Sequence, residues 1–285
     1  MRQILLPYDF SPQAQRALTL VMNGIPFGVE AQVDVLHVID DRMYNRVLSA
    51  HAAPSQDAIK SYLASEIERA APSQRKLTMN PTLTVVRGHP ASEILARAND
   101  YGAVVLGGQG HGGIGEGLLG TIASRVVREA NNSVYVAKRT HASARLQRVM
   151  CAVDDDGDSR HALKEAWSLC RVSGAALSIL RIVPVPFAGV PYPPYSAYPA
   201  HPDIEAEHHR LVRFEVEALA QRFAEHHYIR FASAGFANDI VHQAVLERAD
   251  TLVVGARESG IGKRLLGSVS EGVVARAISD VYVVR

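Results

Sequence analysis

Short apolar runs alternate with stretches of helical periodicity along the whole chain. Val, Ile and Leu dominate the runs, and between them apolar residues recur every three or four positions. Apolar strands separated by amphipathic helices are typical of a parallel sheet that helices cover on both faces. The strands expected on this basis are 3–7, 32–38, 82–87, 103–107 and 133–137, and then 148–153, 176–183, 229–234, 251–255 and 281–284.

The helices between the first strands have recognisable starts and apolar faces. Ser11 followed by Pro12 predicts a helix start, since serine is a common N-cap and proline is favoured at the first helical position. A later start is expected near Ser92. The inward faces expected of the next two helices are Ile59, Tyr62, Leu63 and Ile67, and then Ile94, Leu95 and Ala98.

The same pattern is present twice. An apolar strand ends on Asp9, and its counterpart ends on Asp154, 145 positions later. Two further landmarks recur after 147 positions: Leu118-Leu119-Gly120-Thr121 as Leu265-Leu266-Gly267-Ser268, and Val134-Tyr135-Val136 as Val281-Tyr282-Val283. A nearly constant spacing at three landmarks indicates a duplicated domain.

The chain length of 285 residues fits two domains of roughly 100–200 residues each. We place the boundary in the polar stretch 138–147, which gives domains 1–143 and 144–285. The expected fold class is therefore α/β. It consists of two tandem five-stranded parallel-sheet domains with helices on both faces, related by a pseudo-two-fold axis.

Composition argues against several kinds of partner. Lys and Arg number 30 and Asp and Glu number 29, so the net charge of +1 offers no field that attracts nucleic acid or an anionic membrane. Two cysteines are too few for a disulfide framework and fit a reducing compartment. The first ten residues show neither a leader sequence nor an anchor. We expect a cytoplasmic protein without nucleic-acid or membrane partners, and without a metal site.

Glycine is concentrated after the strand 103–107. Seven of the eleven residues from Gly107 to Gly117 are glycine, and because glycine loses much entropy when it is ordered, this density requires an explanation. Backbone without Cβ lets successive N–H groups converge on an anion, and the helix that Thr121 opens offers unpaired N–H donors at its start. A flexible connection is the other interpretation, but it leaves the glycine spacing unexplained. His111 is either a phosphate contact or a solvated side chain.

The glycine spacing is not that of the common phosphate loops, because no Gly-Lys-Ser/Thr closes it and no Gly-x-Gly-x-x-Gly follows the first strand. Gly107, Gly110, Gly120 and Thr121 instead resemble the motif of the ATP-binding universal stress protein domain. The resemblance covers the whole chain, including the Asp-ended first strand, the Gly88-His89-Pro90 turn and the final Val-Tyr-Val strand. It implies that the nucleotide binds at the carboxyl ends of strands one and four, where open α/β sheets bind ligands.

The implied ligand is ATP or a related adenine nucleotide, with or without Mg²⁺. Pro7, Tyr8 and Asp9 are implied at its adenine and ribose end, and Val38 is implied to meet the adenine through its backbone. Asp9 has a second interpretation, since an Asp at a strand–helix turn often caps the helix.

At the phosphate end, the resemblance implies Leu106 and Gly107 under the ribose. It implies that Gly110 and Gly120 let the backbone approach the phosphates. The implied helix-start N–H donors are those of Thr121, Ile122 and Ala123, with the Thr121 hydroxyl added. No catalytic residue is implied.

The second half departs from this pattern. Its stretch 255–267 is one residue shorter than the loop of the first half, and the second glycine is replaced by Glu258 or Arg257, depending on where the gap is placed. A carboxylate there repels a phosphate, and 154–156 adds three more Asp side chains. The segment 184–202 holds seven of the 14 prolines and is expected to be a surface loop, either a lid or a variable connection. We expect the second half to be a structural or regulatory copy.

We expect a stress-response protein that acts as a binding and signalling module and not as an enzyme. A slow nucleotide-hydrolysing enzyme is the alternative, although no loop lysine or carboxylate cluster for two Mg²⁺ ions is present. A scaffold that binds a hydrophobic small molecule in the second domain is another. The edges of strands 133–137 and 281–284 need a partner. Single-domain members of the resembled family dimerise through this strand, so the two domains are expected to pair within the chain, and a homodimer is the other outcome.

Overall fold

The computed structural model describes residues 3–40, 55–70, 81–110, 119–140, 145–153, 157–183, 226–231, 236–256 and 266–285. The first half contains β1 (Gln3–Pro7), α1 (Pro12–Met22), β2 (Gln32–Asp40), α3 (Gln56–Ala70), β3 (Thr82–Gly88), α4 (Pro90–Ala98), β4 (Ala103–Gly107), α5 (Thr121–Glu129) and β5 (Ser133–Ala137). The second contains β6 (Arg148–Val153), α6 (Gly157–Ser173), β7 (Ala176–Val183), β8 (His226–Phe231), α8 (Phe236–Leu246), β9 (Thr251–Gly255), α9 (Ser268–Arg276) and β10 (Asp280–Val284).

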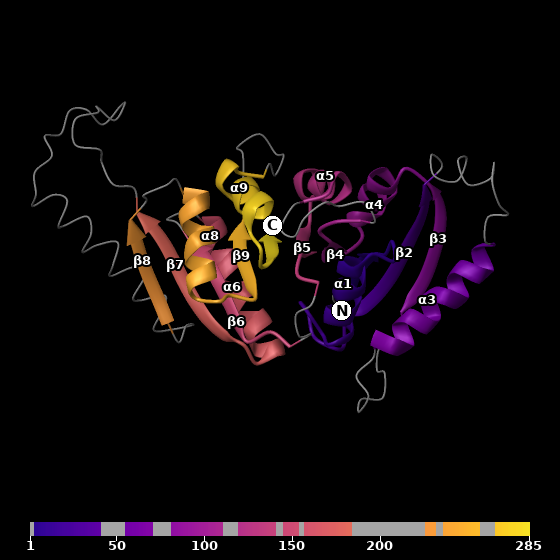
Figure 1. The fold of residues 1–285 in the computed structure, drawn as a ribbon, viewed down its shortest axis with the longest axis horizontal. Helices are drawn as coiled ribbons and strands as arrows, with labels where there is room; N and C mark the ends of the chain where they lie inside the picture. Colours follow the sequence, from indigo (N-terminus) through magenta and orange to yellow (C-terminus); the bar gives the residue numbers. More distant parts are fainter. Residues whose placement is uncertain are drawn as a thin grey trace, which may run out of the picture.

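The strands form one sheet of ten in the order β3-β2-β1-β4-β5-β10-β9-β6-β7-β8 (Figure 1). Within each half all pairings are parallel, and the two halves have the same strand order when each is followed from its outer edge. The expected α/β fold class is confirmed. The two halves meet where β5 pairs antiparallel with β10, with Tyr135 opposite Tyr282 and their ring centroids 5.8 Å apart.

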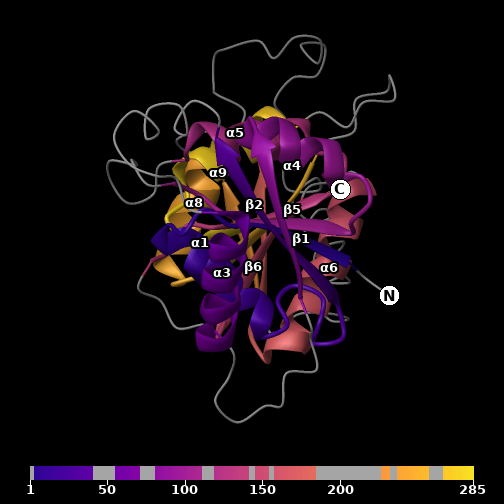
Figure 2. The same cartoon turned by 90° about the vertical axis from the view of Figure 1, so that its right-hand side faces the viewer.

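Helices cover both faces of the sheet. In Figure 2, α4 and α5 lie above the sheet, and α3 and α6 lie below it. Because strand side chains alternate between faces, each face has its own apolar core. Ile4 and Leu6 belong to the core that includes residues of α1, α3 and α6, while Leu5 belongs to the core that includes residues of α4, α5, α8 and α9. Both cores continue through the β5–β10 pairing. The halves are therefore joined by packing as well as by the sheet.

One strand begins earlier than the apolar pattern predicts. β8 starts at His226 and not at 229, because its pairing with β7 runs from Ser178 opposite His226 to Val183 opposite Phe231. Two histidines at the start hide this pairing from a count of apolar residues. The last three positions of the predicted strand, 232–234, lie outside the described residues.

Two details of the predicted helices differ in the structure. α4 begins at Pro90, after His89 as N-cap, two residues before Ser92, near which the start was expected. In α3 the buried positions Ile59, Leu63 and Ile67 repeat every four residues. Tyr62 lies beside this stripe and is 53% exposed. The segment 184–202 and the shortened loop of the second half, from 257, lie outside the described residues.

Candidate functional site

A cavity of about 510 Å³ opens at the carboxyl-terminal ends of β1 and β4. β1 pairs with β2 on one side and with β4 on the other, so the cavity lies where the strand order reverses. Its volume is in the range of small-molecule sites. The lining residues are Pro7, Tyr8, Asp9, Leu36, Val38, Pro90, Ile94, Leu106, Gly107, Gly108, Gln109, Gly110, Leu119, Gly120, Thr121, Ile122 and Ala123.

All eleven residues that the resemblance implies lie on this one cavity. The residues that sequence reasoning missed are Leu36, Gly108, Gln109, Leu119, Pro90 and Ile94. Gly108, Gln109 and Leu119 adjoin implied positions in the chain, and Leu36 lies two residues before Val38. Pro90 and Ile94 come from α4, and the signal for them was the Gly88-His89-Pro90 turn, whose proline is favoured at a helix start.

Two glycines of the loop are required by close approach. A Cβ at Gly107 would lie 2.7 Å from the backbone nitrogen of Ala14 in α1. A Cβ at Gly110 would lie 2.7 Å from Oδ2 of Asp9. Both distances are shorter than a normal carbon contact. The loop therefore lies directly on the end of β1 and the start of α1.

Backbone hydrogen bonds fix both ends of the loop. The Gly120 N–H donates to the Gly108 carbonyl at 2.7 Å, and the Gly108 N–H donates to the Ala137 carbonyl at 2.7 Å. The loop thus closes on itself and is tied to the end of β5. The intervening run 111–118, with His111, lies outside the described residues.

The start of α5 faces the same cavity. Gly120 is its N-cap and has no side chain to accept from the first turn, and the first helical bond runs from the Ser124 N–H to the Gly120 carbonyl at 2.8 Å. The N–H groups ahead of that bond have no acceptor within the helix. These donors and the positive end of the helix dipole favour an anion. The residues of this first turn that line the cavity are Thr121, Ile122 and Ala123.

Asp9 does not cap α1, so that interpretation is wrong. Ser11 is the N-cap, and its Oγ accepts from the Ala14 N–H at 3.2 Å. Asp9 instead accepts from the Ser11 N–H through Oδ1 at 3.0 Å, and its Oδ2 lies against Gly110. Because the residue is exposed, its carboxylate is free to accept from ligand hydroxyls.

Phe10 holds the turn after Asp9 in an uncommon conformation. Its φ of 63° lies in the left-handed region, which is rare for an aromatic residue. Its ring packs 5.2 Å from the ring of Tyr8 and 5.0 Å from that of His37. His37 in turn bonds the Tyr8 carbonyl through Nδ1 at 2.8 Å. Sequence reasoning missed this support, because a positive φ leaves no signal in an aromatic residue.

Tyr8 lines the cavity, and its side chain is also part of the buried core. Its hydroxyl donates to Oε2 of Glu66 in α3 at 3.0 Å, on the opposite face of the sheet. Burial, together with the Glu66 carboxylate, raises the pKa of the Tyr8 phenol well above its usual value. The phenol therefore stays protonated and serves the core and not the ligand.

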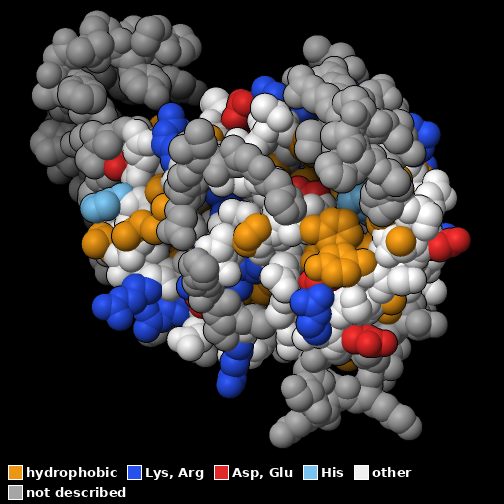
Figure 3. Space-filling model, turned by 45° about the vertical axis from the view of Figure 1, so that its right-hand side comes forward, with side chains coloured by type: hydrophobic (Ala, Val, Ile, Leu, Met, Phe, Trp, Pro, Cys, Tyr) orange, Lys and Arg blue, Asp and Glu red, His pale blue; other side chains and the backbone are white. Residues whose placement is uncertain are grey.

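The cavity wall combines apolar side chains with main-chain donors. Among its described lining residues there is no Lys, Arg or His, and Asp9 is the one carboxylate. Within the part of the chain that the structure describes, no cluster of three or more His, Cys, Asp or Glu side chains is arranged to hold a metal ion. On the face drawn in Figure 3, basic and acidic side chains are interspersed. The arrangement suits a ligand with an apolar body and an anionic end.

No helix among the described residues is both long enough and apolar enough to span a membrane.

Comparison with known proteins extends over the whole chain. A curated relative, a universal stress protein of Methanocaldococcus jannaschii, is 28% identical over 158 residues, which cover 50% of this chain and 97% of that protein. A solved universal stress protein of Archaeoglobus fulgidus has a TM-score of 0.69 at 23% identity and covers 99% of this chain and 98% of its own. A solved structure described as a putative universal stress protein from Pseudomonas aeruginosa has a TM-score of 0.71 at 16% identity, and the match covers 100% of this chain and 93% of that one.

These two structures establish likeness of fold. The family model described as the universal stress protein family matches twice, over residues 1–138 and 145–285. The chain therefore belongs to the universal stress protein family and carries two such domains in tandem.

Proposed function

We propose that the first domain binds an adenine nucleotide, ATP or a close relative, and that the protein is a binding and signalling module in the stress response. The observation that carries the proposal is the convergence, on one cavity, of the glycine loop and the uncapped start of α5. The start of α5 has N–H groups without an acceptor in the helix, and the glycines beside it lack the Cβ that would keep a phosphate away. Such a surface recognises phosphate.

The rest of the cavity suits a nucleoside. Leu36, Val38 and Ile94 offer an apolar wall for a base. Asp9 is the hydroxyl acceptor that a ribose requires, and it lines the same cavity, next to Gly110 of the loop. We therefore assign the base to the wall, the ribose to Asp9 and the phosphates to the loop.

Binding without rapid turnover follows from the same lining. Phosphoryl transfer depends on cations that neutralise developing charge and on a group that orients the nucleophile. The described lining residues supply neither a Lys nor an Arg. We therefore propose a non-enzymatic role. A reducing compartment such as the cytoplasm fits the two cysteines, which are free and buried.

The test compares two equivalent glycines by calorimetric titration with ATP, with and without Mg²⁺. Gly120 and Gly267 are the N-caps of α5 and α9, with φ, ψ of −69°, 159° and −66°, 151°. A Cβ at Gly120 would lie 3.3 Å from the Gly108 carbonyl oxygen, so Gly120→Val should weaken ATP binding by about a hundredfold or more.

Gly267→Val is the matched control and should leave ATP binding unchanged. Circular dichroism establishes that both variants are folded. A folded Gly120→Val protein that binds ATP as the wild type does would contradict the proposed site. Mass spectrometry of the nucleotide released from the denatured wild type would identify the resident ligand.

A further inference from the structure

Contacts across the β5–β10 seam occur in pairs that follow the repeat. Nζ of Lys138, just after β5, donates to the Val274 carbonyl of α9 at 2.8 Å. Nη2 of Arg285, just after β10, donates to the Val127 carbonyl of α5. Lys138 and Arg285 are 147 positions apart, and so are Val127 and Val274, which is the spacing of the repeat. The seam therefore has a pseudo-two-fold axis.

The same symmetry relates Asp280 to Ser133. The Lys138 N–H donates to Oδ1 of Asp280 at 2.9 Å, and the Arg285 N–H donates to Oγ of Ser133 at 3.1 Å. Both acceptors are the first residues of their strands, Ser133 of β5 and Asp280 of β10. One place in the seam thus holds a carboxylate, and its equivalent holds a hydroxyl.

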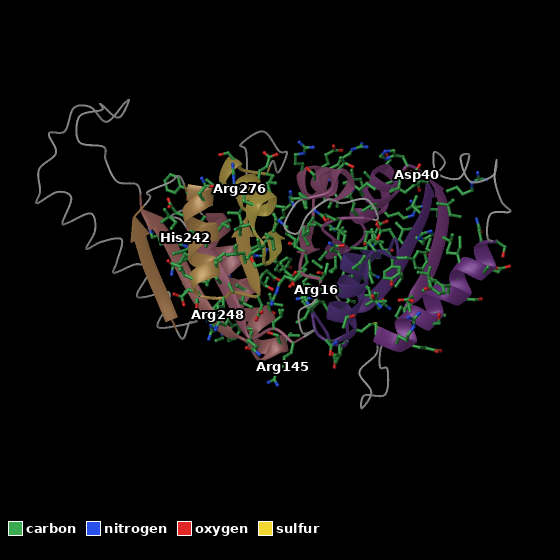
Figure 4. All side chains as sticks on the ribbon, in the orientation of Figure 1. Arg16, Asp40, Arg145, His242, Arg248 and Arg276 are labelled. Atoms are coloured by element: carbon green, nitrogen blue, oxygen red, sulfur yellow. The ribbon has the colours of Figure 1, made fainter. Side chains whose placement is uncertain are left out.

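The carboxylate has a partner in the other half. Nη2 of Arg16 lies 2.6 Å from Oδ2 of Asp280, and its Nε donates to the same oxygen at 3.1 Å. The two side chains are 3% and 0% exposed. Figure 4 shows Arg16 at the junction of the two halves. The ion pair therefore joins α1 of the first domain to β10 of the second.

The equivalent of Arg16 in the second domain is His161. α1 starts at Pro12 and α6 at Gly157, and the spacing of 145 holds through the buried residues that follow, Ala17 with Leu18 and Ala162 with Leu163. His161 is exposed. By the repeat, His161 therefore corresponds to Arg16, and Ser133 corresponds to Asp280.

Further hydrogen bonds support the ion pair, and the loss of either partner is expected to destabilise the folded protein. Asp280 also accepts from the Arg139 N–H at 3.2 Å and from the Tyr135 hydroxyl at 3.5 Å. Burial opposes the charge on Arg16, but the Asp280 carboxylate outweighs it, and the pKa of the guanidinium lies above its usual value. A buried charge left without its partner is strongly destabilising.

We propose that this one-sided ion pair makes the seam selective, so that the face of the first domain fits the second domain and rejects a second copy of itself. If two first domains paired in the same way, each Arg16 would face a Ser133. If two second domains paired, each Asp280 would face a His161. Only the unlike pairing buries the guanidinium against a carboxylate. The proposal concerns the seam alone and does not depend on nucleotide binding.

The test moves the carboxylate across the seam in the full chain. The double variant Ser133→Asp, Asp280→Ser keeps the amino-acid composition. Arg16 can then form its ion pair only with the carboxylate introduced at position 133 in the first domain of another chain. We expect this variant to associate, with a molar mass by light scattering that rises with concentration to about twice that of the wild type.

A cross-link reports the seam itself. Arg128 and Glu271 approach to 3.8 Å across it and are about half exposed, so cysteines placed there should be joined within one chain by a short bis-maleimide. We expect the double variant to lose this cross-link at least tenfold. Cys151 and Cys170 are buried and do not compete.

A milder pair of variants decides the question if the double variant does not fold. Arg16→Gln removes the buried cation, while Asp280 keeps its bonds from the Lys138 N–H, the Arg139 N–H and the Tyr135 hydroxyl. His161→Gln, at the equivalent position of the second domain, is the matched control, because it leaves the Arg16–Asp280 pair in place. We expect Arg16→Gln to associate more than His161→Gln, because a first domain without this cation no longer rejects a second copy of itself. Equal molar masses for these two, or an unchanged mass and cross-link in a folded double variant, would overturn the proposal.

Discussion

Replacing Gly107 or Gly110 by alanine separates the stability of the nucleotide loop from its binding function. Each new Cβ would lie 2.7 Å from another atom. At Gly107 that atom is the backbone nitrogen of Ala14, with the backbone carbon of Gln13 at 2.9 Å. At Gly110 it is the Oδ2 of Asp9, which ends an exposed side chain. The same added methyl group thus meets a fixed obstacle at one position and a movable one at the other.

The expected magnitudes differ accordingly. Gly107→Ala must shift α1 or the loop, and overpacking of this kind costs about 1–3 kcal/mol of unfolding free energy. At Gly110 the Asp9 carboxylate can rotate away, so Gly110→Ala should change stability by no more than about 0.5 kcal/mol. Rotation displaces the group assigned to the ribose. ATP affinity should therefore fall about tenfold in Gly110→Ala, the equivalent of roughly 1.4 kcal/mol.

Urea unfolding and calorimetric titration with ATP measure the two effects on the same samples. Gly110→Ala combined with Asp9→Ala is the control, because without the carboxylate the alanine has nothing to displace. The affinity of this double variant should equal that of Asp9→Ala alone. Equal stability losses at the two glycines, or an additive loss of affinity in the double variant, would refute the reasoning.

Three other outcomes are expected. Burial lowers the pKa of Lys138 to about 8, so above that pH the unfolded chain binds more protons than the folded chain. The unfolding free energy of the wild type relative to Lys138→Met should therefore rise by about 1 kcal/mol from pH 8 to pH 9. A difference that stays constant with pH in chemical denaturation would contradict this. Tyr8→Phe removes the hydrogen bond to Glu66 and should destabilise the fold by about 1–2 kcal/mol without changing ATP affinity. A loss of ATP affinity in titration would show instead that the phenol faces the ligand. A phosphate-release assay should give ATP turnover below roughly 1 s⁻¹, and a faster rate abolished by Gly120→Val would indicate an enzyme.

Most strands were predictable because each is buried on both faces. β4 and β5 are continuous apolar runs in the sequence, and the structure buries nearly all of their residues. β8 was misplaced because its start is polar and is set by pairing with β7, which acts over 48 positions of the chain. Local composition cannot report a partner at that distance.

The candidate site was predictable to the extent that it is local. Gly107, Gly110 and Gly120 belong to one strand–loop–helix unit, so their spacing alone indicates a cradle for an anion. Asp9 was ambiguous, because the choice between Asp9 and Ser11 as the cap depends on backbone angles and not on residue type. The wall from α4 was missed, because a helix that crosses from β3 to β4 enters the cavity only after the sheet has formed.

The ion pair of the seam was beyond sequence reasoning for a stronger reason. Arg16 follows Gln15 in an amphipathic helix, where a charged side chain is usually solvated, and Asp280 precedes an apolar strand, where an Asp usually belongs to a turn. The two residues are 264 positions apart and come together only when β5 pairs with β10. Ser133, the equivalent of Asp280, also bonds across the seam and carries no charge. The repeat therefore predicts that the two strands meet, but the difference between the halves at these positions is what gives the pairing a direction.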